Sequence, residues 1–249
     1  MFPRQLGLGA VLLTVCAASA QGDVIPAEAP PPHAVAPRTL TLEFKLGPYK
    51  PLIDREAALT GKPYETIFGN SSMLLFEIEV DGIFWQKFGT LAVGGSVGYA
   101  AKTGNALIAP GNPGEGTPSG DTTTLRVIPV RLMFIYRLDV GAIRSGIPFV
   151  PYAKTGLVFE PWWTTKGGSV EYANGNRGSG GKWGYGFTGG ISFMLDFLEP
   201  RMAKDFSNDV GISHSYLFAE YTYANVNNFG SKGLDLSSRH WMFGFSVDY

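Results

Sequence analysis

Apolar and polar side chains alternate strictly along the last stretch of the chain. From Trp241 to Tyr249 every second residue is apolar, and the residues between them are mostly small or polar. A period of two predicts a β-strand with one apolar face and one polar face. The run ends on an aromatic residue, a place that a strand of a soluble sandwich rarely gives to an aromatic side chain.

Seven earlier stretches show the same alternation, so the sequence predicts eight strands. Each is about as long as the 9–11 residues of a tilted membrane strand or slightly longer, whereas soluble strands are typically near 5–6 residues. In the fifth stretch the sequence does not decide which side faces the interior, because Lys154 and Gly156 lie on one side and Thr155 and Leu157 on the other. The eight stretches are residues 40–46, 73–81, 90–100, 128–137, 149–162, 183–196, 216–223 and 241–249.

The links between these stretches alternate in length. Short links are predicted at Asp81-Gly82 and at 139–146, and a short helix is predicted at 198–206, with Pro200 in its first turn. Alternating long and short links are typical of an up-and-down membrane barrel with long loops outside and short turns in the periplasm. The long, polar, glycine- and proline-rich links are 47–70, 103–121, 164–181 and 225–238.

The first part of the chain reads as a targeting segment followed by a spacer. Residues 1–20 combine Arg4, a short apolar run and Ala18-Ser19-Ala20, which predicts a secretory signal peptide. The alternative is an N-terminal membrane anchor, but the apolar run is shorter than a spanning helix needs. Residues 21–38 are rich in proline and alanine and predict an extended periplasmic linker. The barrel is then expected over 39–249.

Composition narrows the class of protein without deciding it. The only cysteine, Cys16, lies in the predicted signal peptide, so no disulfide is expected. The formal net charge of −1 and the absence of a Lys/Arg cluster argue against nucleic acid as a partner. Aromatic residues reach 13% while mean hydropathy is only +0.05. These values fit a transmembrane barrel and would equally fit a soluble β-rich secreted protein.

Aromatic side chains are predicted to form two girdles at the membrane interfaces, where amphipathic rings prefer to lie. If the first strand runs outward, Trp162, Trp183 and Trp241 fall near the outer rim. By the same count, Trp85, Tyr136 and Tyr249 fall near the periplasmic rim.

The terminal strand resembles the final strand of bacterial outer-membrane barrels, which the barrel-assembly machinery reads. Its outward residues would then form the assembly signal: Phe243, Phe245, Val247 and Tyr249. Segments 49–54, 198–200 and 214–222 resemble small outer-membrane barrels best known from myxobacteria and their relatives, with an OmpA-like eight-stranded architecture. The resemblance implies the fold and an outer-membrane location, with lipids and lipopolysaccharide as surroundings, rather than an activity. A monomer is expected.

The polar face of the predicted strands carries ionisable residues that would lie inside the barrel. An eight-stranded barrel is just wide enough for side chains to fill it, so such charges must pair or be hydrated. We expect a structural ion-pair network that plugs the lumen, with a narrow gated ion path as the alternative. The expected members are Glu43, Lys45, Glu77, Glu79, Arg131, Arg137 and Glu220.

Other chemistry has weak support. A lipid-modifying enzyme would need a nucleophile, a base and an acid near the outer leaflet; Ser238 and His240 could share a face, but no acid is specified. Glu77 and Glu79 supply too few oxygens for a calcium site. No enzyme activity, cofactor or metal is therefore expected. A soluble lipocalin-like carrier, with apolar residues inside, is a further alternative.

Overall fold

The structure is a computed structural model. It describes residues 38–249 apart from 57–60, 109–110, 167–168, 171, 174–175, 199–210 and 232. The predicted signal peptide 1–20 and residues 21–37 of the predicted linker 21–38 lie outside the described residues. The residues that the structure describes belong to one compact unit.

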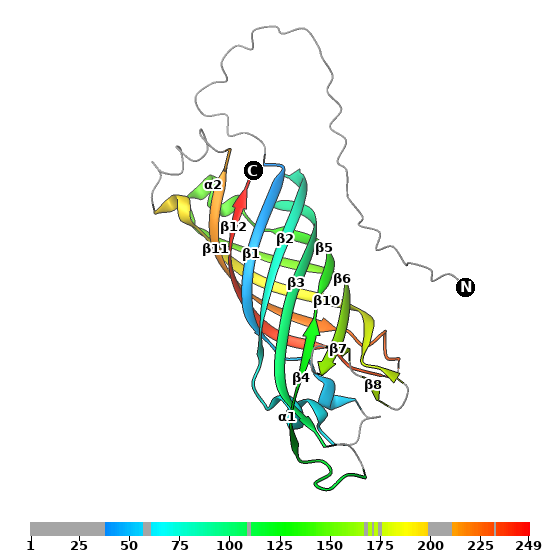
Figure 1. The fold of residues 1–249 in the computed structure, drawn as a ribbon. Coiled ribbons are helices and arrows are strands. Elements are labelled where there is room, and N and C mark those ends of the chain that lie inside the picture. The colour runs from blue at the N-terminus through cyan, green and yellow to red at the C-terminus, as the bar shows by residue number, and fades with distance from the viewer. Residues whose placement is uncertain are drawn as a thin grey trace, which may run out of the picture. The chain divides into compact units, whose positions relative to one another are not determined.

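Long antiparallel strands form a closed ring with eight positions (Figure 1). The ring closes where the first and last strands pair, with Leu42 opposite Val247. This confirms the predicted all-β, eight-stranded antiparallel up-and-down barrel. In ring order the strands are β1 (Leu40–Tyr49), β2 (Met73–Gln86), β3 (Thr90–Leu107), β4 (Pro118–Val127) with β5 (Val130–Arg137), β6 (Phe149–Lys166), β10 (Ser179–Met194), β11 (His214–Asn225) and β12 (Ser238–Asp248).

The strands β4 and β5 share one position of the ring, because both pair with β3 on one side and with β6 on the other. The break between them is Ile128-Pro129. A proline has no backbone N–H to donate to the ladder, so strand pairing is interrupted there. The carbonyl of Pro129 still accepts a 2.8 Å hydrogen bond from the backbone of Gly98.

Two ends of the barrel can be distinguished. The end that we call the loop end carries η1 (Ile53–Arg55) and α1 (Pro63–Phe68), and it also carries β7 (Ser169–Val170) (Figure 1). The short strands β8 (Tyr172–Ala173) and β9 (Asn176–Arg177) lie in the same link as β7. The opposite end, the terminal end, carries α2 (Val140–Ser145), η2 (Leu195–Phe197) and the chain's last residue.

Three predicted links need correction. Asp81-Gly82 is not a turn: β2 continues to Gln86, and the chain turns at residues 87–89 instead. The predicted loops 103–121 and 164–181 are shorter, because their edges pair as strands. Threonine supports this extension where Thr103 faces Thr124, with hydroxyl oxygens 2.9 Å apart. Nearly all of the predicted helix 198–206 lies outside the described residues.

Alternation sorts the side chains into an apolar exterior and a mainly polar interior. Large apolar residues are exposed around the ring, for example Phe76 at 49%, Phe134 at 65% and Phe187 at 53%. This polarity is the one expected of a barrel surrounded by lipid and opposite to that of a lipocalin-like carrier. The structure decides the facing of the fifth predicted strand, because Lys154 points inward and Thr155 points outward. Within the described ranges, no helix is long and apolar enough to cross a bilayer.

Candidate functional site in the barrel lumen

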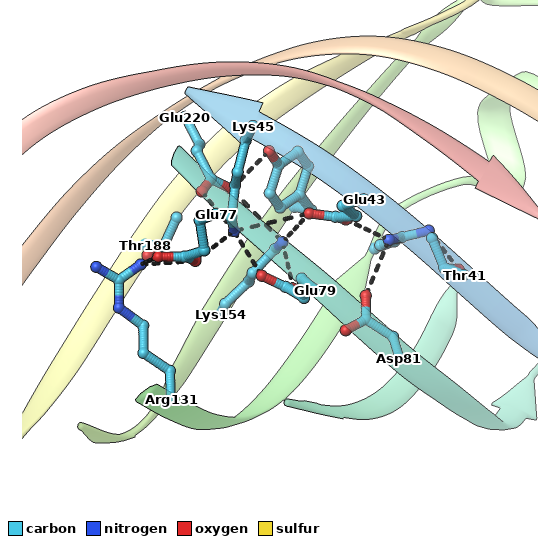
Figure 2. Close-up of polar contacts among 12 residues, drawn as sticks. Thr41, Glu43, Lys45, Glu77, Glu79, Asp81, Arg131, Lys154, Thr188 and Glu220 are labelled. Atoms are coloured by element: carbon cyan, nitrogen blue, oxygen red, sulfur yellow. Dashed lines mark hydrogen bonds and ion pairs between the residues drawn. The ribbon is translucent and has the colours of Figure 1, made fainter. Parts of the chain in front are cut away.

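The centre of the lumen holds two lysine ammonium groups among glutamates (Figure 2). Lys45 of β1 lies 2.9 Å from Glu220 Oε1 and 3.2 Å from Glu77 Oε1, and it also donates to Glu79. Lys154 of β6 lies 2.7 Å from Glu79 Oε1 and 3.5 Å from Glu220 Oε2. All these side chains are buried, so the charges rely on one another rather than on bulk water.

A further ion pair, between Glu43 and Lys154, crosses the whole lumen. Glu43 lies on β1 and Lys154 on β6, and these strands are four positions apart in a ring of eight, on opposite walls. Lys154 Nζ nevertheless lies 2.6 Å from Glu43 Oε2. The ammonium also lies 5.2 Å from the ring centre of Tyr152. At this level the interior is therefore bridged by side chains.

Toward the terminal end the network continues through two arginines. Arg137 Nη2 lies 2.7 Å from Glu43 and 3.2 Å from Asp81, and its Nη1 lies 3.1 Å from Asp248. Asp248 in turn pairs with Arg38 at 3.0 Å. Positive and negative groups thus alternate without a break from the centre of the lumen to the terminal end.

Toward the loop end the network becomes sparser. Arg131 Nη1 lies 2.9 Å from Glu77 Oε2, and the hydroxyl of Tyr49 donates a 2.9 Å hydrogen bond to Glu160 Oε2. Several buried polar atoms here have no hydrogen-bond partner within the described part of the chain. They include both ring nitrogens of His240, Ser238 Oγ and Glu160 Oε1.

An apolar cluster fills the interior at the loop end. Its members come from several strands and from the link after β1, whose Ile53 and Tyr64 are 6% and 1% exposed. Asp54 fixes this link, because its carboxylate accepts hydrogen bonds from the backbone of Tyr64 and of Glu65, at 2.7 and 3.1 Å. The lumen is therefore charged over its middle and terminal parts and apolar at the loop end.

A histidine–aspartate contact at the terminal end joins η2 to the first residue of β11. His214 Nδ1 and Asp196 Oδ2 are 2.6 Å apart, and the backbone of Ser215 donates a 3.1 Å hydrogen bond to the same carboxylate. Burial alone would raise the pKa of Asp196. The hydrogen bonds from His214 and Ser215 outweigh burial and lower this pKa below its ordinary value.

All seven residues expected inside the barrel lie there and are buried: Glu43, Lys45, Glu77, Glu79, Arg131, Arg137 and Glu220. Sequence reasoning missed further members, each for a local reason. Lys154 lies on the fifth predicted strand, for which the sequence does not decide which side faces the interior. Asp81 lies in a predicted turn. Arg38 is the last residue of the predicted linker, yet it is only 5% exposed, and it pairs with Asp139 as well as with Asp248.

The predicted girdle is partly correct. Tyr136, Trp183 and Trp241 are exposed on the outside, at 40%, 52% and 53%. Trp85 and Tyr249 are half-buried near the terminal end. Trp162 must be corrected, because it faces inward and packs against the apolar cluster at the loop end. Adjacent strand residues point to opposite faces, and here Trp163 takes the outward one.

The terminal strand has the predicted facing, with one exception in exposure. Phe243 and Phe245 are 53% and 38% exposed on the outside. Val247 is only 7% exposed, although it lies on the same face. Its register places it between Leu42 of β1 and Ser215 of β11. Val247 is therefore a packed seam residue rather than a lipid-facing one.

Two other sets of residues bear on chemistry. Ser238 and His240 share the inward face, as expected, but they are buried at 0% and 4% and are not hydrogen-bonded to each other. Oxygen atoms of Glu43, Glu79 and Asp81 lie within 4.8 Å of one another, an arrangement that could hold a metal ion. Protein cations already occupy this region, because Lys154 and Arg137 pair with these carboxylates.

Comparisons with known proteins find similarity in fold only. No family model and no curated protein matches the chain. The outer membrane protein OprG from Pseudomonas aeruginosa is 13% identical, with a TM-score of 0.44 over 85% of this chain and 96% of that one. Ail, the attachment invasion locus protein of Yersinia pestis, is 12% identical, with a TM-score of 0.40 over 85% and 97%. The outer membrane enzyme PagL is 11% identical, with a TM-score of 0.41 over 84% and 99%.

Proposed function

We propose that this protein is an integral outer-membrane β-barrel of a Gram-negative envelope, without enzymatic activity, that holds surface loops on a closed lumen. Its role would be envelope structure or interaction at the cell surface. The observation that carries the proposal is the Glu43–Lys154 bridge across the lumen, inside a wall whose exterior is apolar. Lipid requires every backbone polar group of a spanning segment to be paired, which a closed barrel achieves.

The proposal includes an orientation and a set of partners. The loop end faces outward, and the terminal end, with the linker at 21–37, faces the periplasm. The outward aromatics of β12 serve as the signal for the barrel-assembly machinery. Lipids and lipopolysaccharide surround a monomeric barrel. An open ion path is disfavoured, because an ion would have to separate several buried ion pairs and then cross the apolar cluster.

Fractionation and gel mobility test the membrane location. The protein, expressed with its own leader in a Gram-negative host, should be recovered with outer membranes, and it should migrate differently before and after boiling in detergent. Recovery of a folded monomer in buffer without detergent would contradict the proposal.

Cysteine labelling tests the orientation, because the sequence has no cysteine other than Cys16. Ser231, at the loop end, and Ser145, in α2 at the terminal end, are both exposed. A membrane-impermeant maleimide should label Ser231→Cys on intact cells and should label Ser145→Cys only after the outer membrane is permeabilised. The reverse labelling pattern would mean that the barrel has the opposite orientation in the membrane.

A further inference from the structure

The outward face of the barrel has a hollow of about 540 Å³ that extends from β3 to β11. It lies on the lipid-facing side rather than in the lumen, because its lining includes the outward-facing Phe134, Phe187 and Tyr221. Apolar atoms make up most of its surface. A barrel surrounded by lipid would present this hollow to acyl chains.

The strand register explains why the surface is hollow here. Tyr136, Ala153, Gly189 and Tyr221 stand side by side on consecutive strands. The two smallest side chains thus lie next to each other between two tyrosines. A Cβ added at Gly189 would meet nothing within 4 Å, so the floor of the hollow is open space.

A cation stands beside the hollow. Arg239 of β12 is exposed on the outward face and lies opposite Tyr223 of β11 in the register. Its guanidinium carbon lies 5.1 Å from the ring centre of Tyr223, and this ring lines the hollow. Arg239 forms no ion pair with any carboxylate among the described residues.

The position of Arg239 indicates the kind of anion that would meet it. It is the second residue of β12, so it lies at the loop end of that strand, two residues before the outward-facing Trp241. A cation is costly at the middle of a bilayer but is tolerated at the depth of the headgroups. Guanidinium groups bind phosphate through two parallel hydrogen bonds, and stacking on a tyrosine ring holds the group in place.

We propose that the hollow and Arg239 form one binding site for an anionic, phosphate-bearing membrane lipid. An acyl chain lies over Ala153 and Gly189, and the phosphate pairs with Arg239. This inference rests on the proposed function, because it requires the exterior of the barrel to face lipid. It adds a specific site to a surface that would otherwise contact lipid without preference.

Native mass spectrometry of the folded barrel, released from non-ionic detergent micelles, tests the site. The probes are dioleoylphosphatidylglycerol, which is anionic, and dioleoylphosphatidylcholine, which is zwitterionic. Arg239→Gln should lower the affinity for the anionic lipid about tenfold and change the other affinity little. Gly189→Leu, which fills the floor of the hollow, should lower both affinities about fivefold.

A matched control separates the site from the rest of the surface. Gly95 is an outward-facing glycine of β3 that does not line the hollow, and its added Cβ would have ordinary clearance, with the nearest atom at 3.7 Å. Gly95→Leu should therefore bind both lipids as the unchanged protein does.

The possible outcomes are distinct. Equal binding of the two lipids, or equal loss in Gly189→Leu and Gly95→Leu, would overturn the lipid site while leaving the barrel proposal intact. A dimer mass that disappears in Gly189→Leu, with no lipid bound, would assign the hollow to a second copy and also overturn the site. Failure of the unchanged protein to form a heat-modifiable barrel would instead contradict the proposed function.

Discussion

Arg38 Nη1 donates a 3.0 Å hydrogen bond to Asp248 Oδ2, which joins the start of the described chain to the last residue of β12. The two residues are 210 positions apart in sequence. The same guanidinium lies 2.6 Å from Asp139, next to α2. The seam between the first and last strands is thus held by buried side chains as well as by backbone pairing.

We predict that Arg38→Gln destabilises the barrel by about 3–5 kcal/mol, because it leaves the buried Asp139 without its cation and Asp248 with Arg137 alone. Urea unfolding of the detergent-folded protein, followed by tryptophan fluorescence, measures the change. Arg55→Gln is the matched control, since Arg55 is exposed in η1. Equal midpoints for the two variants would mean that the seam does not depend on Arg38.

One of the two lysines at the centre of the lumen, Lys154, provides a second prediction. Lys154→Met removes the cation shared by Glu43, Glu79 and Glu220, and we expect a loss of about 3–5 kcal/mol. Lys62→Met should change stability little, because the Lys62 side chain is 68% exposed.

A double variant tests whether the loss comes from unpaired charge. Glu43→Gln in the Lys154→Met background removes one negative charge from a network that has lost a cation, while Arg137 keeps Asp81 and Asp248 as partners, so it should recover part of the stability. If the two changes destabilise additively, the side chains act independently and the network description is wrong.

Gly94 leaves the space that the Asp81 carboxylate occupies in the charged network. A Cβ on Gly94 would lie 1.9 Å from Asp81 Oδ1, whereas the outward Gly95 has no atom closer than 3.7 Å. Gly94→Ala should therefore displace the Asp81 side chain and cost about 1–3 kcal/mol, and Gly95→Ala should be nearly neutral. The urea midpoints of the two variants measure this difference. A larger loss of stability for Gly95→Ala would mean that Gly95, and not Gly94, faces the lumen.

The outward face of the terminal strand provides a test of lipid contact. Phe245→Arg places a charge on the apolar belt and should cost about 2–4 kcal/mol if Phe245 lies near the middle of the bilayer. Phe229→Arg is the control, because Phe229 is 66% exposed in the link after β11. The heat-modifiable fraction in outer membranes should fall for Phe245→Arg only. Equal assembly of both variants would argue against lipid at this face.

Much of the fold follows from the alternation of side chains. The outward faces, the ring of eight and most members of the charged network are local or periodic features, which a sequence shows directly. Asp81 shows where this reasoning fails. Asp-Gly is a strong hairpin signal, but here the carboxylate pairs with Arg137 from another strand, and β2 continues through Gly82.

Other features depend on contacts between distant segments. Arg38 follows a proline-rich stretch and carries no local sign of burial, yet its partners lie 101 and 210 residues away. Trp162 and Trp163 are adjacent and chemically alike, so only the register of β6 decides which one faces the interior. The alternation of side chains also does not predict the apolar cluster at the loop end, because the link that closes it is polar and contains proline.

The central claim is that the lumen is closed by the Glu43–Lys154 bridge and by the apolar cluster at the loop end. Single-channel recording of the purified, heat-modifiable barrel in planar lipid bilayers tests it most directly. We predict a baseline indistinguishable from that of the protein-free bilayer. Sustained stepwise currents of an open pore, scaling with salt concentration, would contradict the claim.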